Sequence, residues 1–127
     1  MSEAKILVVT DDPILSRALR LVLSAKGYQV AAVDSSENVP QLSRSGKYDL
    51  VLVDDDLYEG AAVEICKRIG TASEIPLIVM NGDGPGNQGL AALHELVSGH
   101  LKKPFGVSEL FSCVSDNVGK LATISGN

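Results

Sequence analysis

The sequence contains little cysteine, few aromatic residues and no excess of positive charge. Among 127 residues there are 2 cysteines and no tryptophan, and 4% of the residues are aromatic. Two cysteines cannot make a disulfide framework, so we expect a protein of the reducing cytoplasm. The net charge of −5 provides no basic surface for a nucleic acid, so we expect no direct nucleic-acid binding.

Long apolar segments and compact metal-binding patterns are also missing. No apolar run approaches the roughly 18 residues that a membrane helix needs, so we expect no membrane insertion. The first five residues, MSEAK, lack the layout of a signal peptide. The spacing of Cys66, His94, His100 and Cys113 matches no compact zinc pattern, and buried core cysteines are the better interpretation.

The most informative stretch is residues 48–56, YDLVLVDDD. Four apolar residues in a row predict a strand buried on both faces, which is typical of the centre of a parallel sheet. Charged groups cannot enter that interior without partners, so the strand ends where the acids begin. The carboxyl ends of such strands form the edge at which ligands bind in open α/β sheets.

Strand-like and helix-like segments alternate along the whole chain, and 45% of the residues are hydrophobic. We predict one domain over residues 1–127, with a folded core at about 4–122 and a frayed tail at 123–127. The alternation predicts a flavodoxin-like, doubly wound α/β fold: a five-stranded parallel sheet in the order 2-1-3-4-5, with five helices. The predicted strands lie at residues 5–10, 28–33, 50–53, 75–80 and 100–102, and the predicted helices at about 13–26, 36–45, 62–69, 90–97 and 107–121.

Acidic residues follow two strands that are neighbours in this order. Asp11 and Asp54 would therefore meet at one edge, and two converging carboxylates need a cation. Together with a backbone carbonyl near Asp56 they form an incomplete set of hard oxygen ligands, which suits Mg²⁺. A carboxylate beside that ion can attack phosphorus, and Lys103, next to Pro104, can supply a positive charge for a phosphoryl group.

The sequence resembles the receiver domain of two-component response regulators. The resemblance rests on KILVVTDDP, YDLVLVD, IPLIVM and LKKPF, which occur in that order over essentially the whole chain. It implies that Asp54 is the phospho-acceptor, that Asp11 binds Mg²⁺ directly, and that Asp56 gives its carbonyl to the metal. Lys103 matches the lysine of the family, and His100 matches its aromatic switch position.

The resemblance also implies how such a domain works in a phosphorelay. It is a signalling domain rather than an enzyme, with at most self-catalysed uptake and loss of the phosphoryl group. The expected partners are a sensor histidine kinase or a phosphotransfer protein, and a downstream protein or output domain. The expected output face comprises the helix from Leu90, the strand 100–102 and the helix from Val107.

Three positions depart from the family pattern. Thr10 replaces the first of two acids, and Asp12 either substitutes for it at the metal or caps the next helix. Asn81 replaces the hydroxyl residue of the switch position, and Tyr58-Glu59-Gly60 replaces a proline-containing turn. Thr10 and Asn81 favour an alternative, a pseudo-receiver that docks a partner without phosphoryl chemistry.

A further alternative is nucleotide or flavin binding. Residues 84–89, GPGNQG, formally match a dinucleotide-binding pattern between a strand and a helix. The pattern follows the fourth strand rather than the first, however, and the acid about twenty residues further on, Glu109, falls in a helix. A glycine-rich loop next to the output face is the simpler interpretation.

Overall fold

The computed structural model describes residues 4–34, 39, 41, 48–57, 61–72, 74–82 and 97–126, except the side chains of Ala72 and of residues 119–126. Its centre is a five-stranded parallel sheet in the order β2-β1-β3-β4-β5, which confirms the predicted fold class and strand order. The strands are β1 (Lys5–Val9), β2 (Gln29–Val33), β3 (Leu50–Asp54), β4 (Leu77–Asn81) and β5 (Gly99–Lys102).

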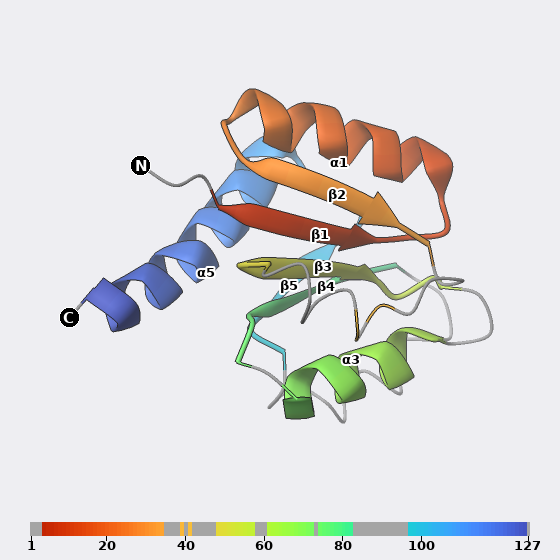
Figure 1. The fold of residues 1–127 in the computed structure, drawn as a ribbon. Coiled ribbons are helices and arrows are strands. Elements are labelled where there is room, and N and C mark those ends of the chain that lie inside the picture. The colour runs from red at the N-terminus through yellow and green to blue at the C-terminus, as the bar shows by residue number, and fades with distance from the viewer. Residues whose placement is uncertain are drawn as a thin grey trace.

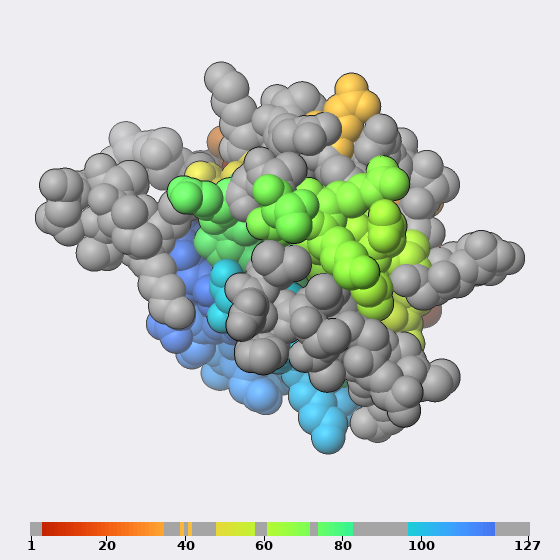
Figure 2. Space-filling view, turned by 90° about the horizontal axis from the view of Figure 1, so that it is seen from below, coloured from red at the N-terminus to blue at the C-terminus, as the bar shows by residue number. Residues whose placement is uncertain are grey.

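Helices cover both faces of the sheet, as Figure 1 shows. Successive side chains of a strand point to opposite faces, so each strand contributes to two cores. One core contains Leu7, Val51 and Val79 and is closed by α3 (Ala61–Ala72). The other contains Ile6, Leu52 and Ile78 and is closed by α1 (Pro13–Ala25) and α5 (Val107–Gly126). Figure 2 looks onto the first of these faces, part of which α3 covers.

β3 is the central strand, as its unbroken apolar run predicts. Each of its residues is buried, including Asp54 at its end. β3 pairs with β1 on one side and β4 on the other, and Asp54 lies opposite Met80. The carboxyl ends of β1, β3 and β4 therefore lie side by side, which places the acids of β3 at the expected edge.

The helix α1 has the N-terminus that its sequence predicts. The Asp12 side chain accepts hydrogen bonds from the backbone N–H groups of Ile14 and Leu15, at 2.9 and 3.3 Å, and Pro13 occupies the first turn. At the other end Gly27 has a φ of 98°, which favours glycine. Leu19 and Leu23 face the sheet and are buried.

The boundaries of some elements differ from the sequence-based ones. β4 begins two residues later than predicted and includes Asn81, because its pairing with β5 extends to Lys102. α5 continues to Gly126, past residue 122, and the chain offers no proline between residues 107 and 126 to end it earlier. The helices predicted at 36–45 and 90–97 lie largely outside the described residues, although Val39 and Val97 are both buried in the core.

The cysteines occupy different environments. Cys66 is a residue of α3 that is buried in the core, and burial raises the pKa of its thiol to about 12. Cys113 is only partly buried on α5. Within the described part of the chain, neither belongs to a group that could hold a metal ion. In that same part of the chain, each helix is too short or too polar to cross a membrane.

Candidate functional site

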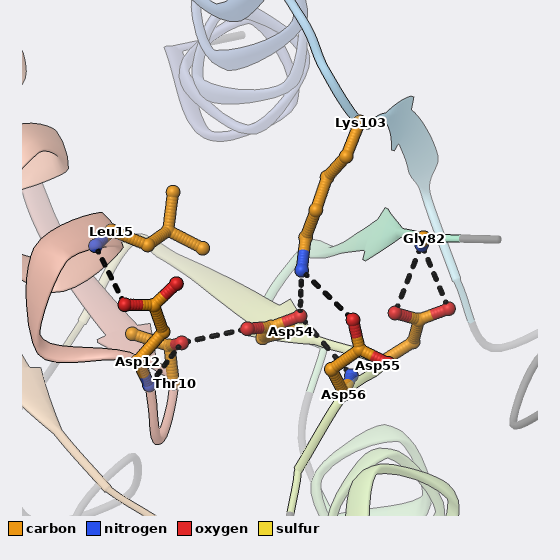
Figure 3. Close-up of polar contacts among 8 residues, drawn as sticks. All are labelled: Thr10, Asp12, Leu15, Asp54, Asp55, Asp56, Gly82 and Lys103. Atoms are coloured by element: carbon orange, nitrogen blue, oxygen red, sulfur yellow. Dashed lines mark hydrogen bonds and ion pairs between the residues drawn. The ribbon is translucent and has the colours of Figure 1, made fainter. Parts of the chain in front are cut away.

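The site is built around Asp54, whose side chain is only 1% exposed. Its Oδ1 accepts hydrogen bonds from Lys103 Nζ at 2.5 Å and from the Asp56 backbone N–H at 3.1 Å. Its Oδ2 accepts a hydrogen bond from the Thr10 hydroxyl at 2.7 Å. These contacts hold the carboxylate at the sheet edge in one orientation (Figure 3). A buried carboxylate with three donors, one of them cationic, is far better stabilised than one without partners.

Lys103 comes from the end of β5, and the sheet sets its position. Its backbone N–H donates to the carbonyl of Asn81 at 2.7 Å, which continues the ladder between β4 and β5 by one step. The side chain extends to the carboxyl end of β3, where Nζ also approaches Asp56 Oδ2, at 3.5 Å. Burial lowers the pKa of Lys103, but the hydrogen bond and charge of Asp54, helped by Asp56, outweigh it and raise the pKa overall. Lys103 therefore keeps its positive charge at neutral pH.

Asp55 is buried as well, although it follows the strand. Its backbone N–H donates to the Met80 carbonyl at 3.0 Å, which extends the pairing of β3 with β4 past Asp54. Its carboxylate accepts the backbone N–H of Gly82 with both oxygens, at 3.0 and 3.1 Å. Burial raises the pKa of Asp55, and the Gly82 N–H opposes this without cancelling it.

Three carboxyl groups thus gather at one point. One oxygen each from Asp54, Asp55 and Asp56 lies within 4.8 Å of the others, the single such group among the residues described. Asp54 and Asp55 are buried, whereas the Asp56 side chain is 58% exposed. One ammonium faces three carboxyl groups, so a divalent cation would balance the remaining charge. Hard oxygen donors with room for water fit Mg²⁺.

Asp11 and Asp12, the acids after β1, are not members of this group of three carboxyl groups. Asp11 lines a separate hollow of about 370 Å³ whose wall also includes Asp34, at the end of β2. Asp12 caps α1 with its side chain, and its backbone N–H donates to the Thr10 hydroxyl at 3.1 Å. Of the two readings of Asp12, the helix cap is the one that the geometry supports. The part of Asp11 as a metal ligand stays a prediction.

We expect Asp12→Ala to lower the free energy of unfolding by about 1 kcal/mol, because two N–H groups of α1 lose their acceptor. Chemical denaturation monitored by circular dichroism measures the loss. Asp12→Ser, which can still cap the helix, is the matched control and should retain most of the stability. A stability loss in both variants, or in neither, would contradict the capping role.

The two residues at the switch positions contact each other directly. His100 Nδ1 and Asn81 Oδ1 are 3.0 Å apart, on neighbouring strands β5 and β4. Since the Asn81 oxygen can only accept, the His100 nitrogen is the donor in this pair. The His100 ring is exposed rather than packed inward. The sequence placed both residues near the edge without indicating that they bond to each other.

Three residues of the site are absent from the sequence-based set. The sequence marks Thr10 as a departure from the family pattern and assigns it no role, yet its hydroxyl donates a hydrogen bond to Asp54. Asp55 and Gly82 were not singled out, although they bond to each other. The Thr10 signal was present, since a hydroxyl ends the strand beside β3. The contact between Asp55 and Gly82 depends on how β4 ends, which no local pattern encodes.

The family of the chain follows from its sequence. Residues 6–115 match the family described as the response regulator receiver domain. The chain belongs to this family. This confirms the resemblance read from the four motifs. Receiver domains are signalling domains, and the acidic group at residues 54–56 is consistent with a phosphorylation site in such a domain.

Relatives and solved structures agree with this assignment. The KDP operon transcriptional regulatory protein KdpE of Escherichia coli is 29% identical over 105 residues, covering 83% of this chain and 47% of KdpE. The transcriptional regulatory protein ResD of Bacillus subtilis is 29% identical over 112 residues, covering 86% of this chain and 45% of ResD. The receiver domain thus spans about half the length of the curated relatives it matches.

The fold is shared with crystal structures of low sequence identity. A response regulator receiver domain protein from Clostridium thermocellum superposes with a TM-score of 0.84 at 20% identity, covering 95% of this chain and 98% of that one. The receiver domain of the sensor histidine kinase PA1611 from Pseudomonas aeruginosa, described with a magnesium ion coordinated in its active site cleft, gives a TM-score of 0.81 at 23% identity. It covers 93% of this chain and 99% of that one.

Proposed function

We propose that this receiver domain accepts a phosphoryl group on Asp54 in the presence of Mg²⁺. The observation that carries the proposal is the buried Asp54 carboxylate, which Lys103 and Thr10 orient at the sheet edge beside two further carboxyl groups. Asp54 and Asp56 would hold the ion, with Asp11 as a further ligand. When bound, the ion offsets the negative charge of the incoming phosphate.

The residues of the chain then have distinct parts in the transfer. A carboxylate oxygen of Asp54 attacks the phosphorus of a small acyl phosphate, and the bond from phosphorus to the donor oxygen breaks. The donor leaves as a carboxylate with that electron pair, so no proton is needed. Thr10 and the Asp56 N–H keep the Asp54 group aligned, and the Lys103 ammonium stabilises the charge on the transferring oxygens.

An apolar groove beside the site supports a protein as the physiological phosphoryl donor. It has a volume of about 550 Å³ and is lined by residues of α1 and of the start of α5, together with Lys103 and Gly82. Ile14 precedes the lining residue Leu15 on α1 and is 80% exposed. A helix of a histidine kinase or phosphotransfer protein would bury this apolar surface while bringing its phosphoryl group to Asp54.

The output is proposed to pass through β5 and α5 to a downstream protein or output domain. Asn81 and His100 link the end of β4 to β5, so a change at Asp54 can reach that face through Lys103 and this pair. Docking without phosphoryl chemistry is the less favoured alternative, because Asp54 and Lys103 are joined in the geometry that transfer requires.

The test is incubation with acetyl phosphate followed by intact-protein mass spectrometry. We expect the mass of one phosphoryl group to be added with Mg²⁺ present and none after chelation. Asp54→Asn should abolish the addition. Asp49→Asn is the same change just before the start of β3 and should leave the addition intact. The Asp49 carboxylate accepts the Lys5 N–H at 2.8 Å, at the amino ends of the strands and away from Asp54. Labelling that persists in Asp54→Asn would overturn the assignment.

A further inference from the structure

The carboxylate of Asp55 lies close to the carboxylate of Asp54, the proposed acceptor of the phosphoryl group. Asp55 holds the Gly82 N–H with both oxygens, and one of its oxygens lies within 4.8 Å of an Asp54 oxygen. A phosphoryl group added to Asp54 extends its oxygens beyond the carboxylate by a further bond. Its oxygens would therefore come near the Asp55 carboxylate, which carries like charge.

Position 82 shows how closely the chain approaches this space. A Cβ placed on Gly82 would lie 3.0 Å from Asp56 Oδ2 and 3.6 Å from Asp55 Oδ1. Glycine lets the backbone come up against both acids and aim its N–H at the site. Backbone N–H groups aimed in this way bind anionic oxygens of any origin, whether carboxylate or phosphoryl.

We propose that Asp55 is a built-in competitor of the phosphoryl group: its carboxylate holds the Gly82 N–H in the unloaded domain, and loading of Asp54 displaces it. The inference rests on the proposed function of Asp54. Displacement transfers the Gly82 N–H from Asp55 to the phosphoryl group, which carries more negative charge. It thereby couples loading to a change at the end of β4, independently of Asn81 and His100.

The first readout needs no ligand. In the ¹⁵N-labelled chain without Mg²⁺, we expect the Gly82 amide to be protected from hydrogen exchange, and Asp55→Ala to remove this protection. Asp55→Asn retains an acceptor oxygen in the same place and should retain part of it. Equal exchange of the Gly82 amide in the parent and in Asp55→Ala would overturn the contact itself.

The second readout is the binding of beryllofluoride at saturating Mg²⁺. We expect Asp55→Ala to lower the concentration for half-saturation about tenfold, which corresponds to about 1.4 kcal/mol. Asp55→Asn should fall between the parent and Asp55→Ala, and it covers the case in which the alanine variant does not fold. Asp49→Asn removes one charge at the opposite end of β3 without touching the Gly82 N–H contact, so it should bind as the parent does.

Each other outcome counts against the inference. Equal gains in Asp55→Ala and Asp49→Asn would show that the loss of a negative charge alone matters, and no gain in Asp55→Ala would show that Asp55 does not compete. Weaker binding or loss of Mg²⁺ affinity in Asp55→Asn would make Asp55 a metal ligand instead. If the parent chain itself binds no beryllofluoride, the proposed function of Asp54 fails, and the competition fails with it even where the Gly82 contact is found.

Discussion

Replacing Lys103 by methionine is expected to slow phosphoryl uptake on Asp54 by about a hundredfold or more, the effect of removing one preorganised donor from a transferring group. Lys103 Nζ contacts Asp54 Oδ1 and approaches Asp56, and its side chain is 23% exposed. It is the one ammonium that the described residues bring to the three carboxyl groups. Without it, an incoming phosphate meets that negative charge with only the metal to offset it.

The measurement is the initial rate of uptake from acetyl phosphate at saturating Mg²⁺, followed by mass spectrometry. Lys102→Met is the matched control, because Lys102 is the preceding residue and its side chain is exposed on β5. That variant should retain the parent rate. Lys103→Arg keeps the charge but replaces a point ammonium with a planar group, and we expect an intermediate rate. A Lys103→Met rate equal to that of Lys102→Met would remove Lys103 from the site.

The strand order could be predicted because it depends on patterns that the sequence displays directly. Continuous apolar runs mark buried parallel strands, and the segments between them are long enough for helical crossovers. The acids that follow β3 cannot be buried without partners, so Asp54 had to lie at the sheet edge. The pairing of Asp54 with Lys103 follows from the same logic, since both residues end strands at that edge.

The finer arrangement of the acids could not be read in the same way. Four aspartates follow a strand in the sequence, and their positions alone do not distinguish them: Asp11, Asp12, Asp55 and Asp56. Their different environments come from backbone hydrogen bonds: Asp12 caps α1, and Asp55 stays buried because its N–H continues the β3–β4 ladder. Whether a carboxylate turns toward a helix end or a neighbouring strand is decided by tertiary geometry, which the spacing of residues does not specify.

The contact between Asn81 and His100 bears on how strongly the domain switches. In the family pattern a hydroxyl residue at this position bonds the phosphoryl group, and here the Asn81 oxygen already accepts from His100 at 3.0 Å. A neutral hydrogen bond contributes about 0.5–1.5 kcal/mol, and one to a charged group about 1.5–3 kcal/mol. The hydrogen bond that keeps His100 exposed therefore offsets part of the free energy that a contact between Asn81 and the phosphoryl group would contribute to switching.

We expect Asn81→Thr to raise the ratio of active to inactive molecules about tenfold in the beryllofluoride-bound protein, the effect of about 1.4 kcal/mol. Threonine supplies the hydroxyl and is too short to hold His100 in its present place. Full conversion of a two-state domain takes about 5.5 kcal/mol, so a gain of this size changes the population visibly.

The positions of the amide resonances of residues 99–102, between their unloaded and fully loaded limits, measure the ratio of active to inactive molecules. Asn81→Ala is the matched control, since it releases His100 without adding a hydroxyl. An equal gain in both variants would assign the effect to the release of His100, and no gain in Asn81→Thr would show that Asn81 does not limit switching.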